Sequence, residues 1–131
     1  GILNVELVSL LLGRWPEAAK EKNRHGDTPL HVACLSPANL DVIMLLLDAF
    51  PEATLERNDY GGNTPEDAAK KYNAPEDVQK LLSSVFNLFN DELRKETLQE
   101  IMSFFIGIQW WKGVWLIFKR HPAVTQTINL D

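Results

Sequence analysis

Apolar positions in this 131-residue chain recur at the spacing of an α-helix and stop at proline. The clearest example is a set of four apolar residues with a proline shortly after them: Val42, Ile43, Leu46, Leu47 and Pro51. The spacing is typical of an amphipathic helix, and proline ends the helix because it lacks an N–H and fits only in a first turn. Adjacent apolar positions fall on neighbouring faces, so we expect this helix to be buried on more than one side.

The same pattern returns along the chain. The segment LLLGRWPEA at 10–18 recurs as LLLDAFPEA, an offset of 35 residues. Four copies are recognisable, at 10–18, 45–53, 77–86 and 114–123. A period of this length is typical of helical solenoids, in which each structural unit packs on its neighbours.

The segments between these helices repeat as well. KNRHGDTP at 22–29 returns as RNDYGGNTP at 57–65. Glycine beside Asn, Asp or His favours a tight turn with positive φ. Thr-Pro predicts a helix N-cap followed by proline at the first helical position. Each repeat is therefore predicted to contain a turn, a short helix, a second helix and a loop.

The segment GDTPLHVA at 26–33 resembles the ankyrin repeat, whose signature is G-x-T-P-L-H-x-A. The resemblance implies that Thr28 and His31 form hydrogen bonds within and between neighbouring turns. We therefore expect His31 to lock a turn, not to act as a catalyst or a ligand.

Later repeats depart from the signature. GNTPEDAA at 62–69 keeps Thr-Pro and an alanine but has Glu66 where the family has a buried leucine, which predicts looser packing. The following repeat lacks G-x-T-P. Its segment 90–102 predicts a longer amphipathic helix capped by Asn90 or Asp91.

The predicted fold class is all-α: an ankyrin-like helix-turn-helix repeat solenoid with short hairpin-like turns. We expect one domain over 1–131. Its parts are a partial second helix at 2–15, repeat one at 20–51, repeat two at 55–87, a divergent repeat three at 88–122 and the start of a further repeat at 123–131. Because stacked repeats need capping units, we expect the sequence to be a fragment of a longer array.

Composition narrows the classes of function. Apolar residues make up 45% of the chain, which supplies a core and argues against disorder. The net charge of −5 argues against nucleic-acid binding, because neutralising phosphates needs clustered Lys and Arg. Cys34 is the only cysteine, which rules out an internal disulfide and favours an intracellular, cytoplasmic location.

The most apolar stretch, 101–118, has about the length of a membrane helix. Lys112 and Gln109 lie near its middle, and the repeat register splits it near Gly107. We therefore favour two buried solenoid helices and keep membrane contact as a weaker alternative. If they are partly exposed, three aromatic residues would form a second contact patch: Trp110, Trp111 and Trp115.

No motif for catalysis, cofactor binding or metal binding emerges. The three histidines fall in predicted turns or loops without Cys or His at metal-ligand spacing. No serine lies in a nucleophile elbow, and there is no glycine-rich phosphate loop. Cys34 is expected to be a small buried hydrophobe. We therefore expect a protein that is not an enzyme and has no cofactor.

The resemblance implies that turn tips and first-helix faces form a concave surface that binds a partner protein. Carried over by position, the expected contact residues are Arg24, His25, Asp27, Leu35, Ser36, Asp59, Tyr60, Asn63, Lys71 and Tyr72. Tyr and Arg most often carry interface energy, which favours Arg24, Tyr60 and Tyr72. Two alternatives remain. One is a structural subunit of a larger complex, membrane-associated or not, packed through the Trp-rich repeat three. The other is the docking arm of an enzyme whose catalytic domain lies outside this chain.

Overall fold

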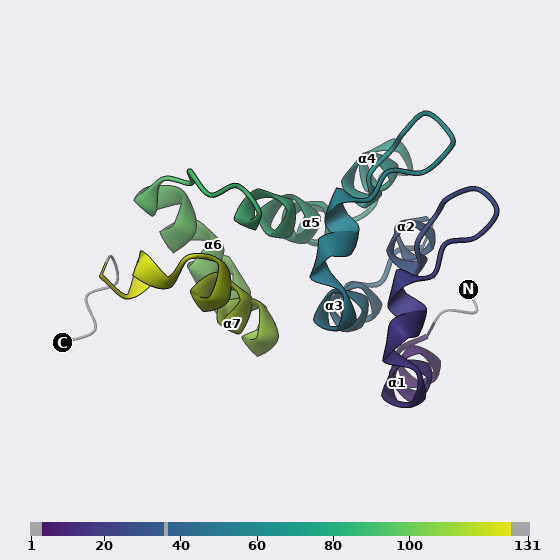
Figure 1. The fold of residues 1–131 in the computed structure, drawn as a ribbon, viewed down its shortest axis with the longest axis horizontal. Coiled ribbons are helices and arrows are strands. Elements are labelled where there is room, and N and C mark those ends of the chain that lie inside the picture. The colour runs from purple at the N-terminus through teal and green to yellow at the C-terminus, as the bar shows by residue number, and fades with distance from the viewer. Residues whose placement is uncertain (1–3, 36, 127–131) are drawn as a thin grey trace. The chain divides into compact units, whose positions relative to one another are not determined.

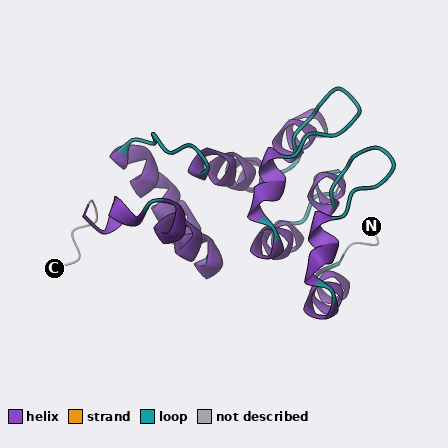
Figure 2. Ribbon diagram, viewed as in Figure 1, coloured by secondary structure: helices purple, strands orange, loops and turns teal. Residues whose placement is uncertain are grey.

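The computed structural model describes residues 4–35 and 37–126, and these are helical with no strand among them (Figures 1 and 2). The elements in chain order are α1 (Val5–Arg14), the 3-10 helix η1 (Pro16–Lys20), α2 (Pro29–Ala33), α3 (Leu40–Ala49), η2 (Pro51–Leu55), α4 (Pro65–Lys71), α5 (Glu76–Leu88), α6 (Lys95–Gly107), α7 (Trp111–Arg120) and η3 (Pro122–Gln126). The predicted all-α helical-repeat class is confirmed.

The chain divides into two compact units, an N-terminal unit (Gly1–Ser83) and a C-terminal unit (Ser84–Asp131). The boundary falls within α5. The N-terminal unit holds the two predicted hairpin-like turns, which project as loops beyond α2 and α4 (Figure 2). The C-terminal unit holds the end of α5 and the helices α6 and α7, which contact each other.

The Thr-Pro signals start helices as predicted. Thr28 is the N-cap of α2, its side chain accepts a hydrogen bond from the backbone N–H of His31, and proline occupies the first turn. Thr64 does the same for α4, with the N–H of Asp67 as the donor. A threonine cap stabilises a helix start by about 1 kcal/mol, because it satisfies one of the first N–H groups, which have no partner in the helix.

The second helices end where prolines were expected to stop them. α1 and α3 each end just before a 3-10 helix that begins at proline, Pro16 in one case and Pro51 in the other. η3 begins in the same way at Pro122. The four apolar residues of α3 named above are all buried, which confirms the expected burial on more than one side.

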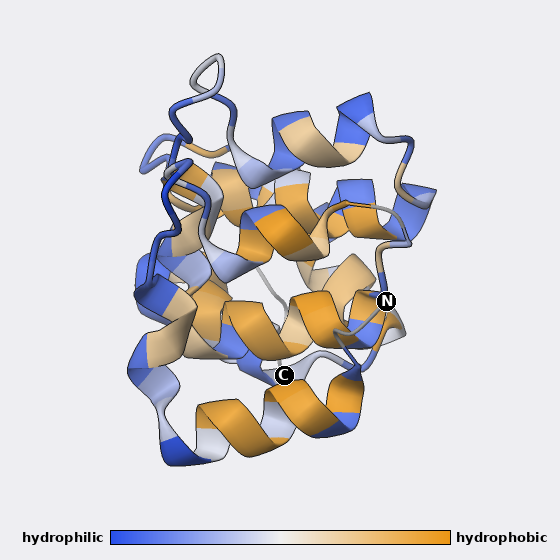
Figure 3. Cartoon of the chain, turned by 90° about the vertical axis from the view of Figure 1, so that its right-hand side faces the viewer, coloured by the Kyte–Doolittle hydropathy of each residue, from blue (hydrophilic) through white to orange (hydrophobic). Residues whose placement is uncertain are grey.

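Helix α1 differs from α3 in one respect. Leu7 and Leu11 hold the register positions of Val42 and Leu46, yet they are 41% and 47% exposed where the two α3 residues are buried. Figure 3 shows this apolar character along α1, the lowest helix in that view. The N-terminal unit thus presents an apolar helix face to solvent.

The apolar stretch of the C-terminal unit forms two helices, as the register predicted. α6 ends at Gly107, and α7 begins at Trp111 after a turn in which Gln109 has a φ of 60°. Within the described residues, no helix is both long and apolar enough to cross a membrane.

The predicted start of α6 was wrong. The helix begins at Lys95, its N-cap is Arg94, and no side chain forms a capping hydrogen bond there. The side-chain oxygen of Asn90 instead accepts a hydrogen bond from the backbone N–H of Glu92, at 3.0 Å. Asn90 therefore stabilises a turn before the helix, a role that competes with capping because the same oxygen serves both.

Candidate partner-binding surface

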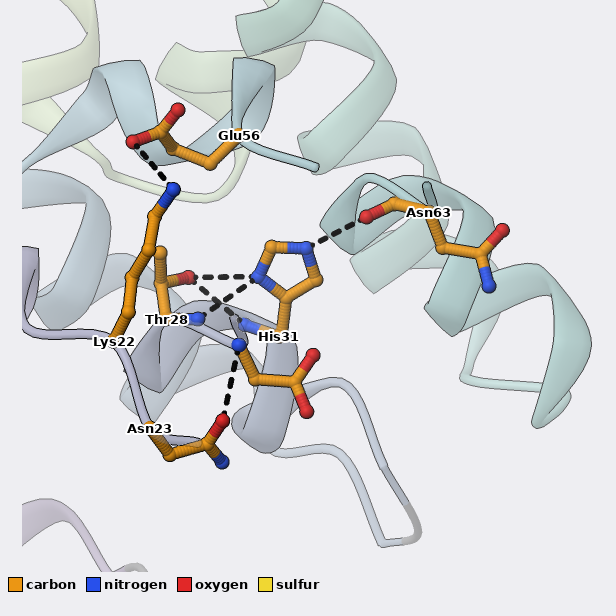
Figure 4. A network of polar contacts seen from close by, with 7 residues as sticks. Lys22, Asn23, Thr28, His31, Glu56 and Asn63 are labelled. Atoms are coloured by element: carbon orange, nitrogen blue, oxygen red, sulfur yellow. Dashed lines mark hydrogen bonds and ion pairs between the residues drawn. The ribbon is translucent and has the colours of Figure 1, made fainter. Parts of the chain in front are cut away.

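A buried histidine joins the two turns of the N-terminal unit (Figure 4). The Nδ1 atom of His31 accepts a hydrogen bond from the backbone N–H of Thr28 at 3.1 Å. Because Nδ1 is an acceptor, the ring proton is on Nε2, which donates to the carbonyl oxygen of Asn63 at 2.8 Å. The role that the ankyrin resemblance implied for Thr28 and His31 is confirmed, within the turn and between turns.

Two further hydrogen bonds hold the turns side by side. The side-chain amide of Asn58 donates to Oδ1 of Asp27 at 2.9 Å. The backbone N–H of Asp59 donates to the carbonyl oxygen of His25 at 2.8 Å. An exposed ion pair between Lys22 and Glu56, 3.5 Å apart and drawn in Figure 4, adds little to stability because water screens it.

Gly26 allows the turns to approach this closely. Its φ is +76°, a conformation that other residues rarely adopt, and a Cβ atom built there would lie 2.9 Å from Cγ of Asp59. The glycines of the second turn, Gly61 and Gly62, also have positive φ, as predicted. The positive φ therefore favours glycine at position 26, and any larger residue would also have to displace the side chain of Asp59.

The second repeat replaces the signature histidine with Asp67. Its carboxylate accepts a hydrogen bond from the backbone N–H of Thr64 at 3.0 Å, which closes a capping box. Within the described residues, the hydrogen bonds of Asp67 stay inside its own turn. Aspartate thus keeps the local role of the histidine and loses the contact to a following turn.

Glu66 takes the place of the buried Leu30 and is itself only partly buried. Its carboxylate lies 3.2 Å from Nζ of Lys70, one helical turn later. The side chain therefore places its methylene groups toward the core while its charge meets a lysine at the surface. The looser packing expected of this repeat stays a prediction.

A hollow of about 280 Å³ opens between the two turns and the first helices. We call it the tyrosine hollow, and its lining residues are Asp27, His31, Leu35, Asn58, Tyr60, Asn63, Ala68, Lys71 and Tyr72. Six of the ten residues expected to contact a partner line it: Asp27, Leu35, Tyr60, Asn63, Lys71 and Tyr72. The structure thus brings together residues that are up to 45 positions apart (27 to 72).

Of the other four expected contact residues, three do not line the hollow: Arg24, His25 and Asp59. Arg24 and Asp59 are exposed on the turns, and Ser36 lies outside the described residues. His25 is half-buried, with its ring 4.7 Å from the ring of Tyr60, centroid to centroid. This ring contact supports one wall of the hollow from outside.

Sequence reasoning missed three lining residues. His31 was treated only as a turn lock, and Ala68 only as a part of the repeat pattern. Asn58 was overlooked, although it holds the position of Asn23 in the repeated turn. That equivalence was the signal that would have found it.

The expected aromatic patch of Trp110, Trp111 and Trp115 needs a correction at one residue. Trp110 is buried, with its ring packed edge-on against Phe105 at a centroid distance of 4.8 Å. It folds under α7 because Gly113 leaves space for the indole. Trp111 and Trp115 are exposed, at 61% and 66%.

The surroundings of Cys34, the only cysteine of the chain, determine the reactivity of its thiol. Cys34 is buried, as expected, and burial raises the pKa of its thiol to about 12. The thiol is therefore neutral at physiological pH, whereas nucleophilic attack and metal binding need the thiolate. Among the described residues, no group of three or more His, Cys, Asp or Glu is placed to hold a metal ion.

Paired helices, proline-led 3-10 helices and turns joined by a buried histidine define a helical-repeat protein of the solenoid class. A family model described as ankyrin repeats (3 copies) matches residues 2–91, more than half of the chain. The chain belongs to the ankyrin repeat family. No curated protein and no solved structure gives a significant match. Ankyrin repeats are generally protein–protein interaction modules and are typically non-catalytic.

Proposed function

We propose that the N-terminal unit binds a partner protein through the tyrosine hollow and the adjacent turn tips. One observation carries the proposal: Tyr60, Tyr72 and Leu35 are all exposed, and all three line the same hollow. Exposed aromatic residues gathered around a concave site are typical of the centre of protein interfaces.

The floor of the hollow is rigid. His31 is buried and hydrogen-bonded at both ring nitrogens, and Asn58 is bonded to Asp27 across the turns. The groups that a partner would meet are therefore already ordered in the free protein. Preorganisation of this kind strengthens binding, because less conformational entropy is lost when the complex forms.

The rim of the hollow combines apolar and charged groups. Nζ of Lys71 lies 5.7 Å from the centroid of the Tyr72 ring. An apolar side chain of the partner would pack between Leu35 and the tyrosine rings. A carboxylate next to that side chain would meet Lys71.

The test uses a partner captured from the native source and then purified. Binding is measured by calorimetry with Tyr60→Ala and Tyr72→Ala, each of which removes an exposed ring from the hollow. We expect each variant to weaken binding by about ten-fold or more, as for interface hot spots. Trp15→Ala, which removes an exposed ring outside the hollow, is the matched control and is expected to bind normally. Normal binding by both tyrosine variants would contradict the proposal.

The two alternatives make different predictions. A structural subunit packed through the Trp-rich repeat three would lose its assembly on Trp111→Ala and keep it on Tyr60→Ala. An enzyme docking arm would bring a catalytic domain on the same polypeptide.

We place the protein in the cytoplasm because its single cysteine stays a thiol, and cell fractionation tests this location.

A further inference from the structure

We propose that the solvent-facing side of α7 is a second docking surface, which takes an acidic protein segment that also carries apolar side chains. We call it the Trp–Lys face, and it consists of Trp111, Lys112, Trp115 and Lys119. It lies in the C-terminal unit and does not depend on the function proposed for the tyrosine hollow.

The face follows from helical spacing. Trp111, Trp115 and Lys119 are each four residues apart, so their side chains lie in one row along the helix. Lys112 lies seven residues before Lys119 and is therefore on the same side of α7. All four side chains are exposed. Trp115 is the most exposed of the large hydrophobic side chains described.

Apolar contacts hold the opposite side of α7 in place. Leu116 and Ile117 are buried. A Cβ atom on Gly113 would overlap the ring of Trp110, so the helix sits directly on that indole. The helix therefore cannot turn its tryptophans inward without losing this packing.

Polar contacts hold the end of the same helix. The guanidinium of Arg120 donates to the carbonyl oxygens of Leu88 and Phe89, at 3.5 and 3.3 Å, and pairs with Asp91 at 3.0 Å. His121 bonds to the carbonyl oxygen of Leu88 at 2.8 Å. The exposed tryptophans therefore lie on a helix that its contacts hold in place. A partner would bind α7 without having to order it.

Charge indicates what kind of partner fits. α7 contains three basic residues and no acidic residue, although the chain as a whole carries −5. Arg120 is occupied by Asp91, whereas neither Lys112 nor Lys119 has an ion-pair partner among the described residues. Two indoles beside two lysines complement a segment with apolar and carboxylate side chains.

A lipid surface fits this face less well. Recognition of anionic lipids typically uses clusters of about four to eight Lys or Arg, and this face has two. The observations therefore favour an acidic protein segment.

The experiment uses the full chain and two synthetic amphipathic peptides as probes. Both peptides carry leucines on one helical face, with glutamates on the other face in one peptide and lysines in the second. Fluorescence anisotropy of the labelled peptides is expected to show at least about ten-fold tighter binding of the acidic peptide. Trp115→Ala should weaken that binding by about ten-fold or more, and Trp115→Phe by less.

Charge reversal gives the sharper test. Lys112→Glu combined with Lys119→Glu is expected to reverse the preference, so that the basic peptide binds more tightly. Lys20→Glu with Lys22→Glu makes the same charge change at two exposed lysines of the N-terminal unit that do not line the tyrosine hollow. This control should leave the preference for the acidic peptide intact. Thermal unfolding of each variant checks that it is folded.

Three outcomes would overturn the proposal. The first is equal affinity for the two peptides, and the second is a preference that charge reversal does not change. The third is binding to phosphatidylcholine–phosphatidylserine vesicles that depends on Trp115 while neither peptide binds, which would assign the face to a lipid surface.

Discussion

The imidazole of His31 donates a hydrogen bond from Nε2 to the carbonyl oxygen of Asn63, and its Nδ1 accepts one from the N–H of Thr28. One buried side chain therefore joins a helix cap in one repeat to the turn of the next. The tyrosine hollow lies over this contact, because both His31 and Asn63 line it. Stability and the shape of the candidate binding surface are coupled at this residue.

His31→Ala is expected to lower the free energy of unfolding by about 2 to 4 kcal/mol. The substitution removes the partner of the buried N–H of Thr28 and of the partly buried carbonyl of Asn63, and it also opens a cavity. Urea unfolding followed by circular dichroism measures the change. His25→Ala, at a half-buried tip position, is the control and should cost less than about 1 kcal/mol. Equal effects of the two substitutions would contradict the role given to His31.

Gly26→Ala is expected to destabilise the fold more than Gly62→Ala. Both glycines have positive φ, so both substitutions introduce backbone strain of about 1 kcal/mol or more. Only at Gly26 does the new Cβ also meet Asp59. Combining Gly26→Ala with Asp59→Gly should therefore recover part of the loss. If the two single variants unfold at the same urea concentration, the close contact is unimportant.

Glu66→Leu is expected to stabilise the protein by about 1 kcal/mol. Leucine buries more apolar area at this partly buried position, at about 25 cal/mol per Å², whereas the surface ion pair with Lys70 contributes less than about 0.5 kcal/mol. The change is measured as a rise in Tm. Glu52→Leu, at an exposed position, serves as the control and should have little effect. A lower Tm for Glu66→Leu would show that the repeat is already well packed around glutamate.

Cys34 should make stability depend on pH in alkaline solution. Burial raises its folded-state pKa from 9.0 to about 12, so between these values the unfolded chain loses the thiol proton while the folded chain keeps it. The contribution of this group is complete below pH 9 and falls by about 1.4 kcal/mol per pH unit as pH rises toward 12. Cys34→Ala removes this dependence, and the difference between the two unfolding curves isolates it from other titrating groups. Identical slopes for the two proteins would contradict the buried neutral thiol.

The repeated pattern was sufficient to predict the main elements of the fold. Proline positions, Thr-Pro caps and the split near Gly107 all depend on local rules that single segments obey. The start of α6 was missed because the side chain of Asn90 serves equally well in a turn and in a cap, and tertiary packing decides between them. Trp110 was included in the conditional aromatic patch for a related reason, since its burial depends on the space left by Gly113 three residues later.

The candidate site was only partly predictable. Residue types and repeat equivalence pointed to the two turns and the two first helices. Their convergence into a hollow depends on contacts between repeats, such as the amide of Asn58 with Asp27, which local spacing does not reveal.

The most direct test of the central proposal is crosslinking mass spectrometry on the protein purified with its partner from the native source, at moderate salt. If the tyrosine hollow and turn tips bind the partner, reproducible crosslinks will join one protein to lysines of the N-terminal unit, namely Lys20, Lys22, Lys70 and Lys71. Crosslinks confined to Lys95, Lys112 and Lys119 would contradict that proposal and assign the partner contact to the C-terminal unit.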